Sequence, residues 1–239
     1  MFPRLNIGSK MLEDKFQAVV NPYGVMYNPA SVWHTIERYD GPKPNMVFVT
    51  LGTNRVYIEK SSGQIVDNCM KRPQQLFTEY DLTIDESALY LRRTIHHLHQ
   101  INPQAMIVFT VSPIRYRKYG YHASQLSKAT LLLAIDKIIS QQAQNVMYFP
   151  AYEILLDELR DYRFYSEDML HPSQQTVNYI YQQVATTFFS LQTQQFLKAW
   201  HPLKQALNHQ PINPQSKEYK AFQTELQRKI NQLAQQYPL

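Results

Sequence analysis

The chain has 239 residues, a length that suits one moderate domain with an appendage, and its 44% hydrophobic content can fill a packed core. That content excludes a chain that is disordered throughout. The net charge of +5 is not gathered into a run of lysine and arginine, so we expect no nucleic acid as partner. A nucleic-acid-binding protein would be favoured only by the overall basicity.

One cysteine, Cys69, excludes an intramolecular disulfide and a cysteine-based zinc site, and it suits a reducing compartment. The chain has no run of 18 apolar residues and no cationic-then-apolar start, so we expect a cytoplasmic protein with no membrane partner. The sequence indicates no cofactor and no metal. On one predicted helix, only His96 and His99 share a face, which favours an exposed helix surface over a metal site.

The first forty residues predict two helices with a strand and turns between them. Apolar residues at Ile7, Met11, Leu12 and Phe16 have helical spacing, so a helix is expected where a first strand would otherwise stand. The other elements expected here are a strand at 17–20, a turn at 21–24 and a helix at 31–39.

From residue 46 onward, apolar strands and helices alternate. The runs 46–51 and 105–111 are almost entirely apolar, as buried parallel strands are. Asp85 and Ser124 each have the chemistry of a helix N-cap. Residues 55–84 resemble an insertion, with a hairpin at 61–63. The remaining expectations are helices at 86–100, 124–142 and 150–160 and a strand at 146–149.

The C-terminal part predicts helices. From Ser173 the apolar positions keep helical spacing as far as Phe188, and a break at 208–214 follows. A last amphipathic helix carries one apolar stripe, made of Phe222, Leu226, Ile230, Leu233 and Tyr237. We therefore predict a main domain at 1–190 and a helical extension at 191–239, which either docks on the main domain or binds a partner.

Strands that alternate with helices predict an α/β fold, with a parallel sheet covered on both faces. Ligands bind such sheets beyond the carboxyl ends of the strands. Polar groups leave the predicted strands at that end or follow soon after, and we expect them to converge on one site. They are Gly24, Asn54, Ser112, Arg115 and the pair Asp168 and His171.

Asp168 and His171 are the candidates for acid–base chemistry. A carboxylate three residues before a histidine can hold the imidazole ring and stabilise its protonated form, which is what a general base needs. The same spacing also opens ordinary helices, with the aspartate as N-cap. Both interpretations stay open on these residues alone.

Gly24 and Asn54 are candidate donors to an oxyanion, Gly24 through its backbone N–H and Asn54 through its side-chain amide. Each has an ordinary alternative, since both residue types are common in turns and caps. Asn28, in the loop after Gly24, is a further candidate for the same pocket.

The nucleophile is the gap in such a site. Ser9 follows a glycine but lies within the first helical pattern, not on a strand-to-helix turn. Ser112 ends a strand but precedes a proline, as a turn residue does. Arg115 can hold an anionic or sugar oxygen, or it can belong to a solvated loop. Tyr162, Phe164 and Tyr165 can wall a pocket or merely pack their loop.

Six motifs are long enough to be specific: Asn6-Ile7-Gly8, residues 20–29, Gly52-Thr53, residues 110–113, residues 125–131, and Tyr152-Glu153-Ile154 through Asp168-Met169-Leu170-His171-Pro172. Together they closely resemble the bacterial GSCFA-domain family over residues 1–190. That family is similar to the SGNH/GDSL hydrolases. The resemblance therefore implies a flavodoxin-like three-layer α/β/α sandwich, with a site that cleaves or transfers an ester on a small molecule or a carbohydrate.

By position, Asp168 and His171 match the Asp-x-x-His block of that superfamily, Gly24 resembles its glycine block and Asn54 its asparagine block. Met1 falls where the family's Gly-Ser-Cys-Phe-Ala motif has its cysteine, so the resemblance places the presumed nucleophilic serine and the first strand ahead of Met1. We therefore expect a missing or degenerate first strand and little esterase activity from these 239 residues. The alternative is a non-catalytic carbohydrate- or partner-binding protein that uses the same crevice.

Overall fold

The computed structural model describes residues 29–39, 41, 43–66, 69, 72–141, 144–207 and 215–237, together with the backbone at 4–7, 9–10 and 17–18. Contacts divide the chain into two units, Met1–Asn178 and Tyr179–Leu239, and each unit is described by itself. This division falls inside one helix, whereas the boundary predicted at 190/191 follows that helix and stays a prediction.

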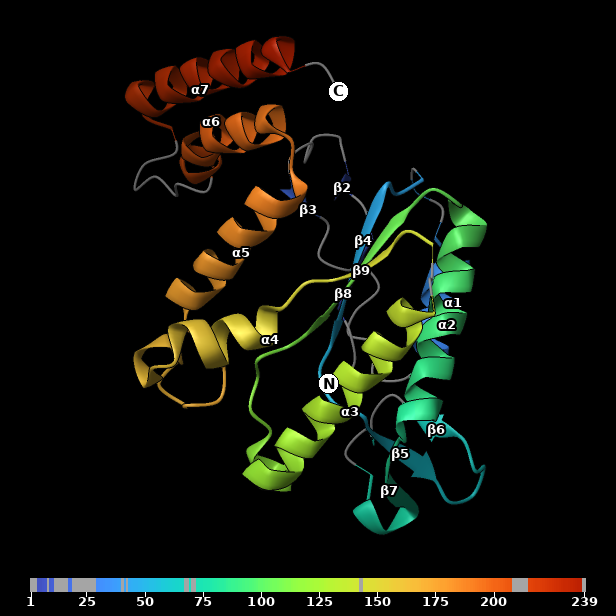
Figure 1. Ribbon diagram of the computed structural model, residues 1–239. Helices are drawn as coiled ribbons and strands as arrows, with labels where there is room; N and C mark the ends of the chain where they lie inside the picture. Colours follow the sequence, from blue (N-terminus) through green and yellow to red (C-terminus); the bar gives the residue numbers. More distant parts are fainter. Residues whose placement is uncertain are drawn as a thin grey trace. The chain divides into compact units, whose positions relative to one another are not determined.

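Three parallel strands form the centre of the first unit: β4 (Met46–Leu51), β8 (Met106–Val111) and β9 (Val146–Tyr148) (Figure 1). Met46 lies opposite Met106, and Ile107 lies opposite Val146. The parallel sheet predicted from the apolar runs is therefore confirmed. Because the strands share one direction, their carboxyl ends meet at one edge of the sheet.

The start of the chain differs from the prediction. A helix was expected from Ile7, but Arg4–Ile7 forms strand β1, which pairs with β4 in the antiparallel direction. Two further short strands, β2 (Ser9–Lys10) and β3 (Gln17–Ala18), pair with each other. The predicted helix was wrong at residues 7, 9 and 10, because its pattern was local, while the partner of β1 lies forty or more residues further along the chain. Positions 11–16 of that pattern lie outside the described residues. The sheet order is β1-β4-β8-β9.

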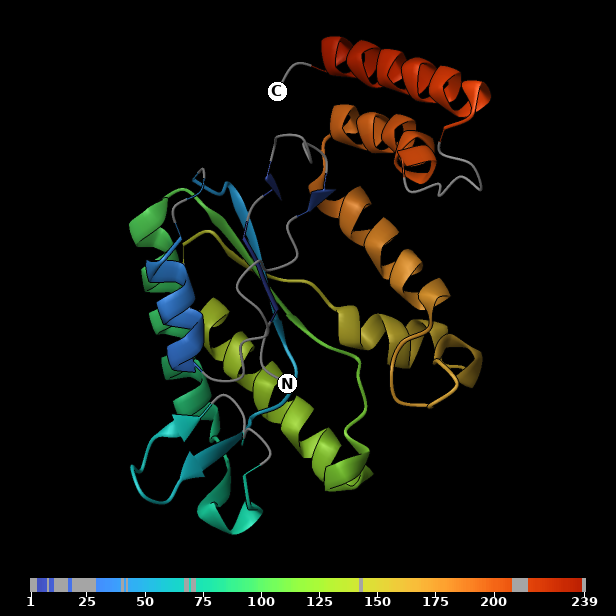
Figure 2. The ribbon, with the colours of Figure 1, turned by 180° about the vertical axis from the view of Figure 1, so that it is seen from behind.

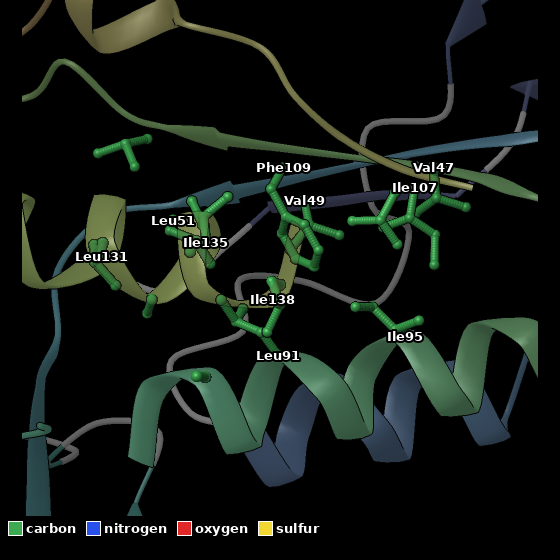
Figure 3. Close-up of a cluster of buried hydrophobic side chains, with 14 of the residues drawn as sticks. Val47, Val49, Leu51, Leu91, Ile95, Ile107, Phe109, Leu131, Ile135 and Ile138 are labelled. Atoms are coloured by element: carbon green, nitrogen blue, oxygen red, sulfur yellow. The ribbon is translucent and has the colours of Figure 1, made fainter. Parts of the chain in front are cut away.

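Helices α1 (Pro29–Glu37), α2 (Ile84–Ile101) and α3 (Tyr121–Ser140) pack their apolar faces against one face of the sheet. Figure 2 shows α1 beside α2, and Figure 3 shows how α2 and α3 meet side chains of β4 and β8 in the core. The fully buried core side chains include Val47, Val49, Leu98, Ile107, Phe109, Ile135 and Ile138. The fold is α/β, consistent with a three-layer α/β/α sandwich.

Two helix starts differ from the prediction. Thr83 rather than Asp85 is the N-cap of α2, because Thr83 and Glu86 form a reciprocal capping box in which each side chain accepts the other's backbone N–H. Helix α3 begins at Tyr121, so Ser124 lies in its first turn rather than capping it, and Ser124 Oγ accepts the backbone N–H of Tyr116.

The predicted insertion between β4 and α2 contains the expected hairpin. Strand β5 (Arg55–Glu59) pairs with β6 (Ile65–Val66) and with β7 (Phe77–Asp81), both in the antiparallel direction. Leu82 donates its backbone N–H to the carbonyl oxygen of Asn54, which closes the insertion back onto the end of β4.

After β9 the chain is helical, as predicted, although the geometry changes along it. Helix α4 (Ala151–Glu153) continues into a π-helical turn, Ile154–Leu159, and then into a 3₁₀ turn, Tyr162–Phe164. Helix α5 (Gln174–Phe188) follows. No helix among the described residues has both the length and the apolar character that a membrane crossing requires.

The second unit contains α6 (Leu191–Leu207) and α7 (Lys217–Gln236), which pack against each other. Phe196, Trp200, Leu226 and Leu233 are buried, and the ring of Phe196 meets that of Tyr237 edge-on. Leu226 and Leu233 belong to the apolar stripe predicted for the last helix. The break predicted at 208–214 lies outside the described residues.

Candidate functional site

The carboxyl end of β4 is held by α3. Thr53 and Ser127 share a hydrogen bond of 2.9 Å between their hydroxyls, and Ser127 Oγ also accepts the backbone N–H of Asn54 at 3.0 Å. Asn54 is 5% exposed, and its Nδ2 donates to the carbonyl oxygen of Leu82 at 2.7 Å. The polar loop predicted after this strand is therefore a buried, tightly bonded turn.

The other side-chain atom of Asn54, Oδ1, has no hydrogen-bond partner among the described residues, and neither does Ser87 Oγ. Both residues border a cavity of about 40 Å³ between β4, α1, α2 and α3, which is large enough for a water molecule. The side-chain amide of Asn54 therefore donates its hydrogen bond inside the unit, to the carbonyl oxygen of Leu82.

Lys128 joins the ends of two strands. Its Nζ donates to the carbonyl oxygens of Gly52, after β4, and Ser112, after β8, at 2.6 Å each. Lys128 is 2% exposed, and its Nζ lies 5.1 Å from the ring centre of Tyr116. Burial lowers the pKa of Lys128 to about 7, because a desolvated ammonium is disfavoured. The amine thus joins the ends of β4 and β8, and no carboxylate of the described residues pairs with it.

Sequence reasoning missed Lys128, although a signal was present. Lys128, Leu131, Ile135 and Ile138 follow helical spacing, and all four are buried on the same side of α3. A lysine on the apolar stripe of a helix must find polar partners inside the fold, and here those partners are strand-end carbonyls.

Arg115 connects the loop after β8 to the segment that carries Asp168 and His171. Its backbone N–H donates to the carbonyl oxygen of Leu170 at 3.0 Å, and its Nη1 donates to that of Met169 at 3.1 Å. The guanidinium also lies over three tyrosine rings, at 4.4 to 5.7 Å from their centres: Tyr121, Tyr162 and Tyr165. Arg115 therefore has a defined set of contacts, unlike the solvated loop residue that the sequence left as an alternative.

Asp168 and His171 form the pair that their spacing predicts. Asp168 Oδ2 lies 2.5 Å from His171 Nδ1, and Oδ1 accepts the backbone N–H groups of Leu170 and His171 at 2.9 and 3.0 Å. The hydrogen bond from the His171 backbone, then that from its ring, then that from Leu170 lower the pKa of Asp168 to about 2. The carboxylate is therefore ionised at neutral pH.

The protonation of the ring follows from this geometry. An ionised carboxylate only accepts hydrogen bonds, so Nδ1 of His171 carries the proton that faces Asp168. In the neutral ring Nε2 is then free to accept a proton. The two side chains are 55% and 44% exposed, and Nε2 has no hydrogen-bond partner among the described residues.

The segment around this pair is held by backbone bonds. Ser166 donates its N–H to the carbonyl oxygen of His171 at 2.8 Å, and Tyr165 forms an isolated bridge with Pro172. Thr176, which is fully buried, donates from Oγ1 to the carbonyl oxygen of Phe164 at 2.6 Å. Met169, at the tip, has a left-handed φ of 57°. The pair thus lies on a closed loop. The alternative, in which Asp168 is the N-cap of a helix that contains His171, does not match this loop.

A hollow of about 250 Å³ lies beside Arg115. The residues that line it come from the loop after β8, from α3 and from the segment after β9: Arg115, Gln125, Leu155, Leu156, Arg160, Asp161, Tyr162 and Tyr165. Tyr162 and Tyr165, for which the sequence left wall and packing open, therefore form part of a wall.

The predicted site residues are brought together in two groups. Arg115 contacts the loop of Asp168 and His171, while Asn54 and the carbonyl of Ser112 are joined to Ser127 and Lys128, two consecutive residues of α3. Among the described residues, no hydrogen bond joins His171 to Asn54. Gly24 and Asn28 lie outside the described residues, and Ser9 is described only by its backbone.

The histidines of α2 do not form a metal site. Among the described residues, no group of three or more histidine, cysteine, aspartate or glutamate side chains could hold a metal ion. His96 accepts or donates a bond with Gln100, and His97 lies 5.8 Å from Trp33, ring centre to ring centre, in a stacked arrangement.

Comparison with known proteins gives two family matches. The family model described as GSCFA family matches residues 40–184, and the one described as GSCFA domain protein, C-terminal domain, matches residues 200–239. The first match covers β4 to α5 and includes the pair Asp168 and His171. No curated protein and no solved structure matches the chain.

Proposed function

The chain belongs to the GSCFA family, and on that premise we propose that its fold serves the cleavage or transfer of an ester-linked acyl group. His171 is the general base and Asp168 its orienting carboxylate, and the nucleophile is the serine that the resemblance places ahead of Met1. One observation carries the proposal: the 2.5 Å contact between Asp168 and an exposed imidazole whose Nε2 is left unbonded among the described residues. The relation to SGNH/GDSL hydrolases, which the motifs suggest, is part of the proposal.

The chemistry assigned to the pair is proton transfer. As the hydroxyl oxygen of a serine attacks the ester carbonyl, His171 Nε2 takes the hydroxyl proton, and Asp168 stabilises the imidazolium that forms. When the tetrahedral intermediate breaks down, Nε2 returns the proton to the oxygen of the leaving alcohol. Water then releases the acyl group by the same path. With a pKa of about 2, Asp168 remains a carboxylate throughout the neutral range.

The test is the hydrolysis of p-nitrophenyl acetate. Because the resemblance places the serine ahead of Met1, the assay compares the 239-residue chain with a version extended by a Gly-Ser-bearing strand of the family. We expect activity in the extended version and a loss of about 10²- to 10⁴-fold in kcat/KM on His171→Ala, the usual contribution of a general base. Asp168→Asn should lower kcat as well.

The matched control is His96→Ala, which removes an exposed imidazole from α2 and should leave the rate unchanged. Equal rates for the extended chain and its His171→Ala variant would contradict the proposal. Binding of an acetylated sugar that survives His171→Ala, with no turnover in any version, would favour a non-catalytic carbohydrate-binding protein. That second candidate is favoured by the tyrosine-walled hollow beside Arg115.

A further inference from the structure

Arg160 stands at the rim of the hollow beside Arg115 in an uncommon backbone conformation. It ends the π-helical turn with φ 48° and ψ 21°, and its N–H donates to the carbonyl oxygen of Leu155, five residues back, at 3.1 Å. Residues other than glycine rarely adopt this left-handed conformation, and they cluster at functional sites when they do. Arg160 is exposed, and its guanidinium has no carboxylate partner among the described residues.

The polar groups that line the hollow are mostly donors. The guanidinium of Arg115 has its bond to the carbonyl of Met169 and no carboxylate partner within the described part of the chain. Gln125 receives the hydroxyl of Tyr152 on Oε1, which leaves its amide N–H groups as donors. These groups complement an acceptor that carries negative charge.

The one acid that lines the hollow is already engaged. Asp161 accepts the backbone N–H of Arg163 at 2.9 Å, and its carboxylate lies 3.8 Å from Nε of the same residue. Two guanidinium groups therefore face the hollow against a single carboxylate, which is turned to a third arginine. The rings of Tyr162 and Tyr165 add flat apolar surface, and Tyr162 is 63% exposed.

We propose that this hollow binds the anionic group, a carboxylate or a phosphate, of a sugar ester, with Arg160 and Arg115 as its ligands. The inference rests on the proposed function, because it names the class of substrate for the same site. Arg115 connects the two places directly: it lines the hollow and donates to the backbone carbonyls of Met169 and Leu170, the two residues between Asp168 and His171. We expect an anion held there to leave the uncharged ester group of the same molecule on the side of the hollow where Arg115 contacts these two residues.

Isothermal titration of the 239-residue chain with glucuronate, glucose 6-phosphate and glucose tests the proposal without turnover. We expect at least one anion to bind about tenfold more tightly than glucose, and the stronger of the two identifies carboxylate or phosphate as the preferred group. Arg160→Gln should weaken anion binding about tenfold, whereas Arg160→Lys should retain most of it. Arg38→Gln removes an exposed arginine of the same unit that does not line the hollow and should change nothing.

Three outcomes would each overturn the inference. They are equal affinities for glucose and both anions, no binding of either anion at 10 mM (about the weakest affinity that such a titration measures), and anion binding that is unchanged in Arg160→Gln. Circular dichroism of each variant verifies that it is folded. His171→Ala separates the two proposals, because it should lower ester hydrolysis by the extended version and leave anion binding intact. Anion binding without hydrolysis would keep the inference and reject the enzyme, while hydrolysis that ignores the charge of the sugar would do the reverse.

Discussion

Lys128 places an amine inside the protein, and no acid of the described residues pairs with it, so stability should depend on pH. The pKa of Lys128 is about 7 in the folded chain and has its ordinary value of 10.5 in the unfolded chain. Between these values the unfolded chain holds a proton that the folded chain has released. The free energy of unfolding must then rise with pH, by at most about 1.4 kcal/mol per unit.

Lys128→Met should remove this contribution. Urea unfolding at several values between pH 7 and 10 should give a wild-type midpoint that rises relative to that of Lys128→Met. The exposed Lys60→Met serves as the control and should follow the wild type. If the urea midpoints of wild type and Lys128→Met changed equally with pH across this range, burial of Lys128 would not lower its pKa as argued. Both bonds of Nζ survive deprotonation, because a neutral amine still has two N–H groups for the carbonyls of Gly52 and Ser112.

At the same scale, the sequence predicted the groups whose partners are local. Asp168 and His171 lie three residues apart, and the hydrogen bonds between them need no other part of the fold. Arg160 and Lys128 were not predicted as site residues, because their roles depend on non-local placement. Arg160 meets residues from the loop after β8, and Lys128 reaches two strand ends that are 16 and 76 positions away.

At the scale of the element, the capping box of α2 is a direct target. Thr83→Ala removes the acceptor for the backbone N–H of Glu86 and weakens the reciprocal bond, so we expect a loss of about 1 kcal/mol in the free energy of unfolding. Thr130→Ala, in the middle of α3, is the control; its hydroxyl bonds only within its own helix, and the change should be neutral or slightly stabilising. Equal losses for both variants, measured by urea unfolding, would argue against the capping box.

The helices and strands also show which elements can be predicted from a sequence pattern alone. The strands β4, β8 and β9 and the helices between them were predicted because each one buries a continuous apolar face. Asp85 was taken as the cap of α2 because its chemistry is suitable, but Thr83 with Glu86 satisfies two backbone donors at once. Strand β1 was not predicted, because four residues of pattern cannot reveal a partner strand that follows much later.

At the scale of the whole molecule, the two tryptophans report on different units. Trp33 belongs to α1 of the first unit and donates to Thr94, while Trp200 is buried in α6 of the second. The second unit has 61 residues, from 179 to 239, and a small set of buried apolar side chains, so we expect it to unfold at a lower urea concentration.

Fluorescence of two variants checks this expectation. Trp33→Phe leaves Trp200 as reporter of the second unit, and Trp200→Phe leaves Trp33 as reporter of the first. Adding Leu226→Ala, a buried position of α7, should cost about 2–5 kcal/mol and move only the transition that Trp200 reports. Coincident midpoints, shifted together by Leu226→Ala, would mean that the chain unfolds as one cooperative body.

Strand β9 has a consequence for how copies of this protein meet in a crowded solution. It pairs with β8 on one side and ends the sheet order, yet it is only three residues long and is followed within two residues by Pro150, which has no backbone N–H. A second chain that tried to extend the sheet there would gain very few main-chain bonds. The edge of the sheet at β9 is therefore a poor template for amyloid-like stacking.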